Sequence, residues 1–136
     1  MLFRSDFPRV VSNSWGGPLR ETWQEIINTW RSMGIIPVFA AGNSGPQPNT
    51  IGSPGGYQEV ISIGATDSSD KIAYFSSRGP VTYKGETYIK PDVSAPGVDV
   101  YSAKPGGGFQ NMSGTDRKST RLNSSHSSVS RMPSSA

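Results

Sequence analysis

The residue best suited to chemistry in this sequence is Asn43, which follows an apolar run and has glycine directly before it. The run 35–40 ends in the segment Ala41-Gly42-Asn43-Ser44-Gly45-Pro46. A side-chain amide donates hydrogen bonds to developing negative charge and has no proton to lose at working pH. The adjacent glycine lets a ligand backbone approach closely. The same residue types also favour a plain turn after a strand. This segment alone is therefore compatible with a hydrogen-bond donor site and with a structural turn.

Two further clusters of polar and glycine residues end apolar stretches in the same way. They are Ser14-Trp15-Gly16-Gly17 and Gly64-Ala65-Thr66-Asp67. In an open parallel sheet the carboxyl ends of the strands meet at one edge, where loops gather and ligands bind. We therefore expect these clusters and Asn43 to share one rim and to form a cleft there.

The elements that position these clusters begin with a short apolar strand at 10–11 and a helix after it. Apolar residues at i, i+3, i+4 and i+7 predict one stripe of an amphipathic helix, formed by Trp23, Ile26, Ile27 and Trp30. Gly34 suits the C-terminal cap of that helix. The buried strand 35–40 completes a strand, helix, strand unit, which requires parallel strands and a right-handed crossover.

Further strands are predicted at 60–65, 72–75 and 98–101, and a β-hairpin at 81–89 turning at Lys84-Gly85. The fold class that follows is α/β with a mainly parallel sheet.

Composition excludes several function classes. The 136 residues include no cysteine, so disulfides and thiolate metal sites are excluded. No set of His, Asp and Glu has metal-ligand spacing, and Gly106-Gly107-Gly108 does not sit between a strand and a helix as a nucleotide-binding loop requires. No stretch approaches the ~20 apolar residues of a membrane span. Charged residues near Met1 leave no apolar run for a signal peptide, so we expect none in this chain.

Residues 116–136 differ from the rest in charge. Residues 1–115 hold nine Lys/Arg and nine Asp/Glu, so the whole net charge of +3 lies in this tail. Eight of its residues are Ser, and so little apolar surface cannot offset the entropy of ordering. We interpret 116–136 as a disordered, Ser/Arg-rich, non-native tail similar to translated adapter or vector sequence. A nucleic-acid arm is the alternative, but the tail has no aromatic residue for base stacking.

Four ordered motifs within residues 10–115 resemble the subtilisin-like serine proteases (subtilases). They are Ser12-Asn13-Ser14-Trp15-Gly16-Gly17, the Asn43 segment, Phe75-Ser76-Ser77-Arg78-Gly79-Pro80, and Lys90-Pro91-Asp92-Val93-Ser94-Ala95-Pro96-Gly97 running on to Asn111-Met112-Ser113-Gly114-Thr115. The resemblance implies a subtilisin-like three-layer α/β fold, of which 1–115 is an interior part of the catalytic domain.

The resemblance also implies roles for individual residues. Asn43 corresponds to the oxyanion-hole asparagine, which makes it the one catalytic assignment. Substrate binding is implied for Ser14, Trp15, Gly16, Ala41, Gly42, Gly114 and Thr115. Packing of Trp15 in the core is its structural alternative. The segments around Arg78 and Lys90 are structural in the family, and both charges are interpreted as solvated.

The family's nucleophilic serine would follow Thr115, but Asp116 stands there. The single histidine, His126, lies in the tail on the wrong side of Asn43, and Asp6 sits in no matching motif, so neither fits the triad. We therefore expect a fragment of a serine endopeptidase that is itself inactive and retains only the oxyanion asparagine and part of the substrate rim. The alternative is a pseudoprotease that binds peptides without cutting them.

The expected partner is an extended peptide or protein, with no nucleic acid and no membrane. By resemblance the intact parent is secreted. No metal site or certain cofactor is predicted, although calcium could bind the intact parent with help from Asp67 and Asp70.

Overall fold

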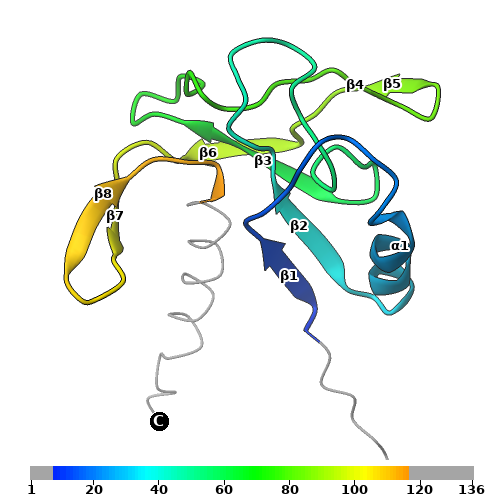
Figure 1. The fold of residues 1–136 in the computed structure, drawn as a ribbon, viewed down its shortest axis with the longest axis horizontal. Coiled ribbons are helices and arrows are strands. Elements are labelled where there is room, and N and C mark those ends of the chain that lie inside the picture. Colours follow the sequence, from blue (N-terminus) through cyan, green and yellow to red (C-terminus); the bar gives the residue numbers. More distant parts are fainter. Residues whose placement is uncertain (1–7, 117–136) are drawn as a thin grey trace, which may run out of the picture.

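A four-stranded parallel sheet organises the part of the chain that the computed structural model describes, residues 8–116 (Figure 1). Its strands are β1 (Val10–Asn13), β2 (Ile36–Ala40), β3 (Ile61–Thr66) and β6 (Val93–Pro96). They lie in the order β1-β2-β3-β6, and every neighbouring pair is parallel. The mainly parallel sheet predicted from the sequence is therefore present.

Helix α1 (Gln24–Ser32) connects β1 to β2, as the predicted strand, helix, strand unit requires. It ends where predicted, because Gly34 adopts a φ of 78°. The Gly34 N–H donates to Arg31 O at 3.0 Å, and the Ile35 N–H donates to Trp30 O at 2.9 Å. These two bonds satisfy the last carbonyls of the helix and turn the chain into β2.

The main hydrophobic core lies between α1 and one face of the sheet. Ile27, Phe39, Tyr57 and Val60 are all buried there. The predicted stripe of α1 is only partly buried, however, since Ile26 is 48% exposed. Of the four apolar residues predicted to form the stripe, only Ile27 is fully buried in the core. The stripe therefore faces the sheet along one side only.

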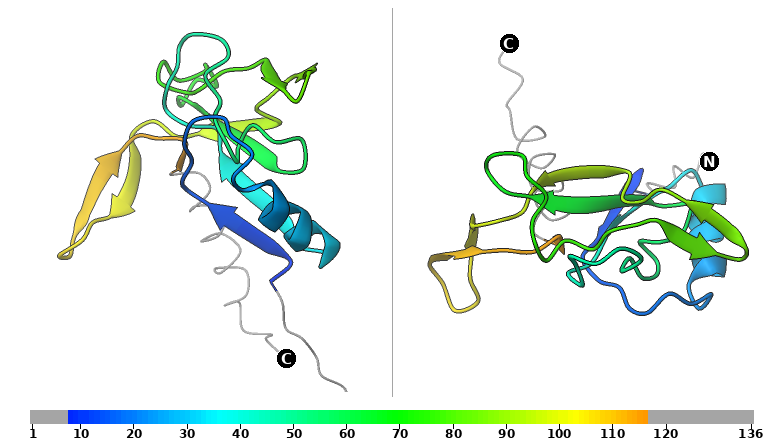
Figure 2. Two further views of the ribbon diagram at one scale, coloured as in Figure 1. Left: turned by 45° about the vertical axis from the view of Figure 1, so that its right-hand side comes forward. Right: turned by 90° about the horizontal axis from the view of Figure 1, so that it is seen from above.

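Two antiparallel hairpins extend from this core. The first joins β4 (Val81–Tyr83) to β5 (Glu86–Tyr88), and its turn is at Lys84-Gly85 as predicted, both with positive φ. The second joins β7 (Val100–Ala103) to β8 (Phe109–Met112) and stands apart from the sheet in every view (Figure 2).

The strand expected at 72–75 does not form. This segment makes turns and a single bridge between Ile72 and Thr66. Its backbone is used elsewhere, because the Ala73 N–H donates to Ala65 O and Phe75 O accepts from the Gly45 N–H. β6 and β8 were not predicted as strands. The strand predicted at 98–101 forms two residues later in the sequence, as β7.

Lys90 is not solvated, contrary to the expectation. Its side chain is 3% exposed, and Nζ lies 2.6 Å from Asp92 Oδ2 and 2.7 Å from Val60 O. Asp92 Oδ2 also accepts from the Ser62 N–H at 2.7 Å. Lys90 and Asp92 therefore join the starts of β3 and β6. The predicted tail lies outside the described residues except for Asp116.

Candidate functional site

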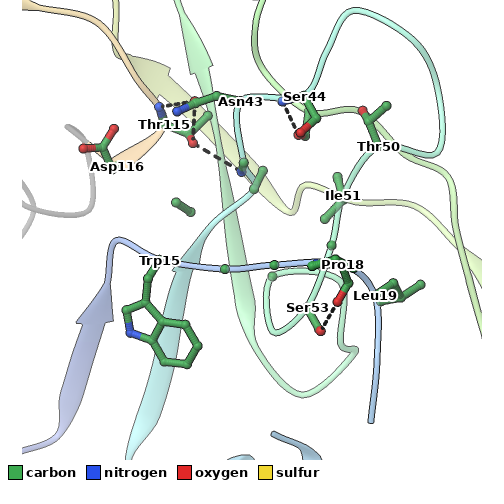
Figure 3. A pocket seen from close by; sticks show the side chains of 18 of the residues that line it. Trp15, Pro18, Leu19, Asn43, Ser44, Thr50, Ile51, Ser53, Thr115 and Asp116 are labelled. Atoms are coloured by element: carbon green, nitrogen blue, oxygen red, sulfur yellow. Dashed lines mark hydrogen bonds between the residues drawn. The ribbon is translucent and has the colours of Figure 1, made fainter. Parts of the chain in front are cut away.

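A cavity of about 760 Å³ opens at the carboxyl ends of β1 and β2 (Figure 3). Its walls come from the segments that follow these two strands, from the loop 49–55, and from Thr115 and Asp116. The cavity lies at the rim predicted from the direction of the strands, but residues 64–67, the third cluster expected there, do not line it. Ser14 and Asn43 enter it from neighbouring strands.

The structure brings nearly all predicted site residues together. Those that line the cavity are Ser14, Trp15, Gly16, Ala41, Gly42, Asn43 and Thr115. Gly114 lies behind them, and its N–H donates to Gly97 O at 2.9 Å. A Cβ at Gly114 would lie 2.1 Å from Asp116 Oδ1, so this glycine makes room for the Asp116 side chain.

The side chain of Asn43 is oriented by Thr115. Asn43 Oδ1 accepts two hydrogen bonds, from the Thr115 N–H at 3.0 Å and from the Thr115 hydroxyl at 3.0 Å. The hydroxyl oxygen in turn accepts from the Gly42 N–H at 3.2 Å. A flipped amide would set its NH₂ group against the Thr115 N–H, donor against donor. The network therefore fixes Oδ1 toward Thr115 and leaves the NH₂ group as the outward donor.

The backbone around Asn43 is tied to the segment 75–77. The Ser77 N–H donates to Gly42 O at 2.9 Å, and Ser77 Oγ accepts from the Ser44 N–H at 3.0 Å. The neighbouring Gly45 is bound to the same segment through Phe75 O. Ser77 lines the cavity but was not predicted as a site residue. Its motif, residues 75–80, was interpreted as structural only, because its partners Gly42 and Ser44 lie more than 30 residues away.

The opposite wall is closed by a bridge between Gly17 and Ser53. The Gly17 N–H donates to Ser53 O at 2.9 Å, and the Ser53 N–H donates to Gly17 O at 3.1 Å. Ser53 Oγ donates to Pro18 O at 2.8 Å and accepts from the Arg20 N–H at 3.0 Å. A Cβ at Gly52 would lie 1.8 Å from Gly17 O, so only glycine fits there. Nothing in the sequence predicted the pairing of Gly17 with Ser53 in this wall.

Trp15 stands at the mouth of the cavity and is 46% exposed. Its ring meets Trp23 edge-on at 5.1 Å between centroids and Phe39 at 5.2 Å. The two expectations for Trp15, rim and core, are therefore both met in part. One edge packs on the core, and the rest forms an apolar surface beside the opening.

Charge is scarce in the cavity. Among the residues that line it, only Asp116 is charged. The backbone oxygen of Asp116 accepts a hydrogen bond from the Ser14 hydroxyl at 3.1 Å. Asp116 directly follows Thr115, at the position where the motif resemblance predicts the serine. No histidine occurs between residues 8 and 116, and both His126 and Asp6 lie outside the described residues.

Asp67 serves a turn, since its Oδ1 accepts from the Ser69 N–H at 2.8 Å and the Lys71 N–H at 3.0 Å. Over residues 8–116, no group of three or more His, Cys, Asp or Glu side chains could hold a metal ion. Nor does any helix in that range have the length and apolarity to cross a bilayer.

Comparison with known proteins identifies relatives of the chain. Residues 4–117 match the Subtilase family. Bacillopeptidase F of Bacillus subtilis is 44% identical over 105 residues, covering 73% of this chain and 7% of that protein. Subtilisin DY of Bacillus licheniformis is 39% identical over 116 residues, covering 83% of this chain and 39% of the relative.

Among solved structures, Sphericase matches with a TM-score of 0.72 and 30% identity, covering 93% of this chain and 44% of that chain. The subtilisin-like α/β fold predicted from the motifs is thereby confirmed. The chain spans less than half the length of each of these three relatives.

Proposed function

Because this chain belongs to the subtilase family, we propose that residues 8–116 are part of the catalytic domain of a serine endopeptidase. The whole protein would hydrolyse peptide bonds through a Ser-His-Asp triad, with Asn43 as a hydrogen-bond donor to the oxyanion of the tetrahedral intermediate. Its substrate is an extended peptide or protein segment, and by family resemblance the whole protein is secreted.

The observation that carries this proposal is the double hydrogen bond from Thr115 to Asn43 Oδ1. An oxyanion donor has to be aimed before the charge develops, because reorganisation during the reaction would cost free energy. Thr115 provides that alignment. Because both bonds are accepted by Oδ1, the NH₂ group is the end of the amide that remains to donate to a ligand.

The substrate rim would act through backbone groups of the segment after β1. Extended peptides bind by adding a strand to an exposed edge, with alternate side chains entering pockets. Ser14, Trp15 and Gly16 run along the cavity mouth, and Ala41, Gly42 and Thr115 border it opposite, with Gly114 behind them. We propose that one substrate side chain enters this cavity, whose lining is uncharged apart from Asp116, while the backbone follows the rim.

The chain itself would not hydrolyse peptides. Asp116 has no hydroxyl for acylation, and a nucleophile needs an adjacent base. The one histidine of the sequence, His126, follows Asn43, whereas in the family the base precedes that asparagine.

A chimera tests the proposal. Residues 10–115 of this chain replace the matching stretch of subtilisin DY, whose flanking sequence supplies the triad. We expect a fluorophosphonate probe to label the chimera at one serine, and peptide amide hydrolysis to accompany labelling. The full chain serves as the negative control and should remain unlabelled. A folded chimera that neither labels nor hydrolyses would contradict the assignment, and labelling of the full chain would refute its inactivity.

A further inference from the structure

Ser77 meets the Asn43 loop with both its backbone and its side chain. Its N–H donates to Gly42 O at 2.9 Å, and its Oγ accepts from the Ser44 N–H at 3.0 Å. These two bonds hold the residue before Asn43 and the residue after it. Thr115 acts separately, on the Asn43 side chain itself.

Ser77 is also packed so closely that its hydroxyl has little freedom to move. The residue is fully buried. Gly42 has a φ of 104°, and a Cβ at that position would lie 2.9 Å from Ser77 Oγ. The hydroxyl therefore fills the space beneath Gly42, and the missing side chain there lets the loop lie directly on it. A buried hydroxyl in this position costs free energy if its partner is lost.

We infer that Ser77 is a positioning residue for Asn43, which it holds through the peptide groups on either side. This inference rests on the proposed function of Asn43 as an oxyanion donor. Without Oγ, the Ser44 N–H has no acceptor, and the peptide unit between Asn43 and Ser44 is free to rotate. The loop can then shift as a whole at Asn43 and Ser44, so the NH₂ group loses its fixed direction even with Thr115 intact.

The neighbouring serine provides a matched control. Ser76 is also fully buried, and its Oγ accepts a hydrogen bond from the Ala65 N–H at 3.0 Å. Replacing either serine by alanine removes one buried hydroxyl that serves one backbone N–H. Only Ser77 bonds to the Asn43 loop through that hydroxyl, so a general loss of packing would affect both variants alike.

The test uses the full chain labelled with ¹⁵N and measures two NMR signals. In S77A, amide hydrogen exchange of Ser44 should be at least about tenfold faster, and the Asn43 side-chain NH₂ signals should shift or broaden. In S76A, exchange should accelerate at Ala65 instead, with the Asn43 signals unchanged. If S77A does not fold, S77C keeps the side-chain volume with a weaker acceptor and should produce the same changes to a lesser degree.

The inference is overturned if S77A or S77C leaves the Asn43 side-chain signals unchanged, or if S76A shifts them equally. These signals report only where the amide points. The oxyanion role itself is decided by the kinetics of Asn43 variants in the chimera, so failure of one result leaves the other intact.

Discussion

Replacing Thr115 by valine removes the side-chain half of the network that orients Asn43. Valine has nearly the same shape, so the substitution leaves no cavity in this buried position. Two hydrogen bonds are lost, the one from the hydroxyl to Asn43 Oδ1 and the one from the Gly42 N–H to the hydroxyl. The Thr115 N–H bond to Asn43 Oδ1 remains.

The magnitude follows from these two losses. A hydrogen bond contributes about 1 kcal/mol net, and a buried donor left without an acceptor costs about 1–3 kcal/mol. Gly42 is only half-buried, so its N–H falls at the low end. We expect T115V to lower the free energy of unfolding of the chimera by about 2 kcal/mol. If about 1 kcal/mol of this is lost alignment of Asn43, kcat should fall about fivefold.

Urea denaturation and steady-state kinetics of the chimera measure both quantities. T87V is the control, because the Thr87 hydroxyl only meets Thr82 on the exposed face of the β4–β5 hairpin. Its effect on stability should stay within about 0.5 kcal/mol. Equal stability losses in T115V and T87V, or an unchanged kcat in T115V, would refute the reasoning that Thr115 orients the amide.

Two further predictions concern the body of the fold. Substituting Lys90 by methionine should lower the free energy of unfolding by about 2–3 kcal/mol. This is less than the loss expected for a fully buried ion pair, because Asp92 is partly exposed. Urea denaturation measures the loss, and a change below about 0.5 kcal/mol would contradict the prediction. Burial, followed by the neighbouring Tyr57 and Glu21, raises the pKa of Tyr83 to about 12. Because the pKa of Tyr83 in the folded protein lies above the ordinary value of 10, folding favours the neutral phenol. The stability that this preference contributes is complete below pH 10 and is lost as pH rises toward 12. Y83F should remove that part of the alkaline loss, whereas an unchanged pH profile would count against it.

Features determined by local sequence could be predicted. The period of the apolar residues indicated α1, Gly34 marked its end, and Lys84-Gly85 marked the hairpin turn. The position of Asn43 after an apolar strand placed it at the rim of a parallel sheet. In each case the interactions that fix the structure lie within a few residues, or follow from the direction of neighbouring strands.

Features determined by distant contacts could not be predicted. Lys90 looked like a solvated charge because nothing near it in sequence reveals Val60 O as its partner. The segment 72–75 has a strand-like composition, but its backbone groups bond to Ala65 and Gly45 instead of forming a ladder. Ser77 and the Gly17–Ser53 bridge belong to the cavity through pairings across more than 30 residues, which no periodicity shows.

The kinetics of Asn43→Ala in the chimera test the central claim most directly. We expect kcat on a peptide amide to fall by roughly 10²–10³ with little change in KM, because the amide meets an oxygen position that is charged only in the transition state. That magnitude is the one known for the corresponding asparagine of subtilisin, and we adopt it without deriving it. N43D should be at least as damaging, since a carboxylate repels the oxyanion. A large rise in KM with kcat unchanged would mean that Asn43 only binds substrate, and would contradict the account.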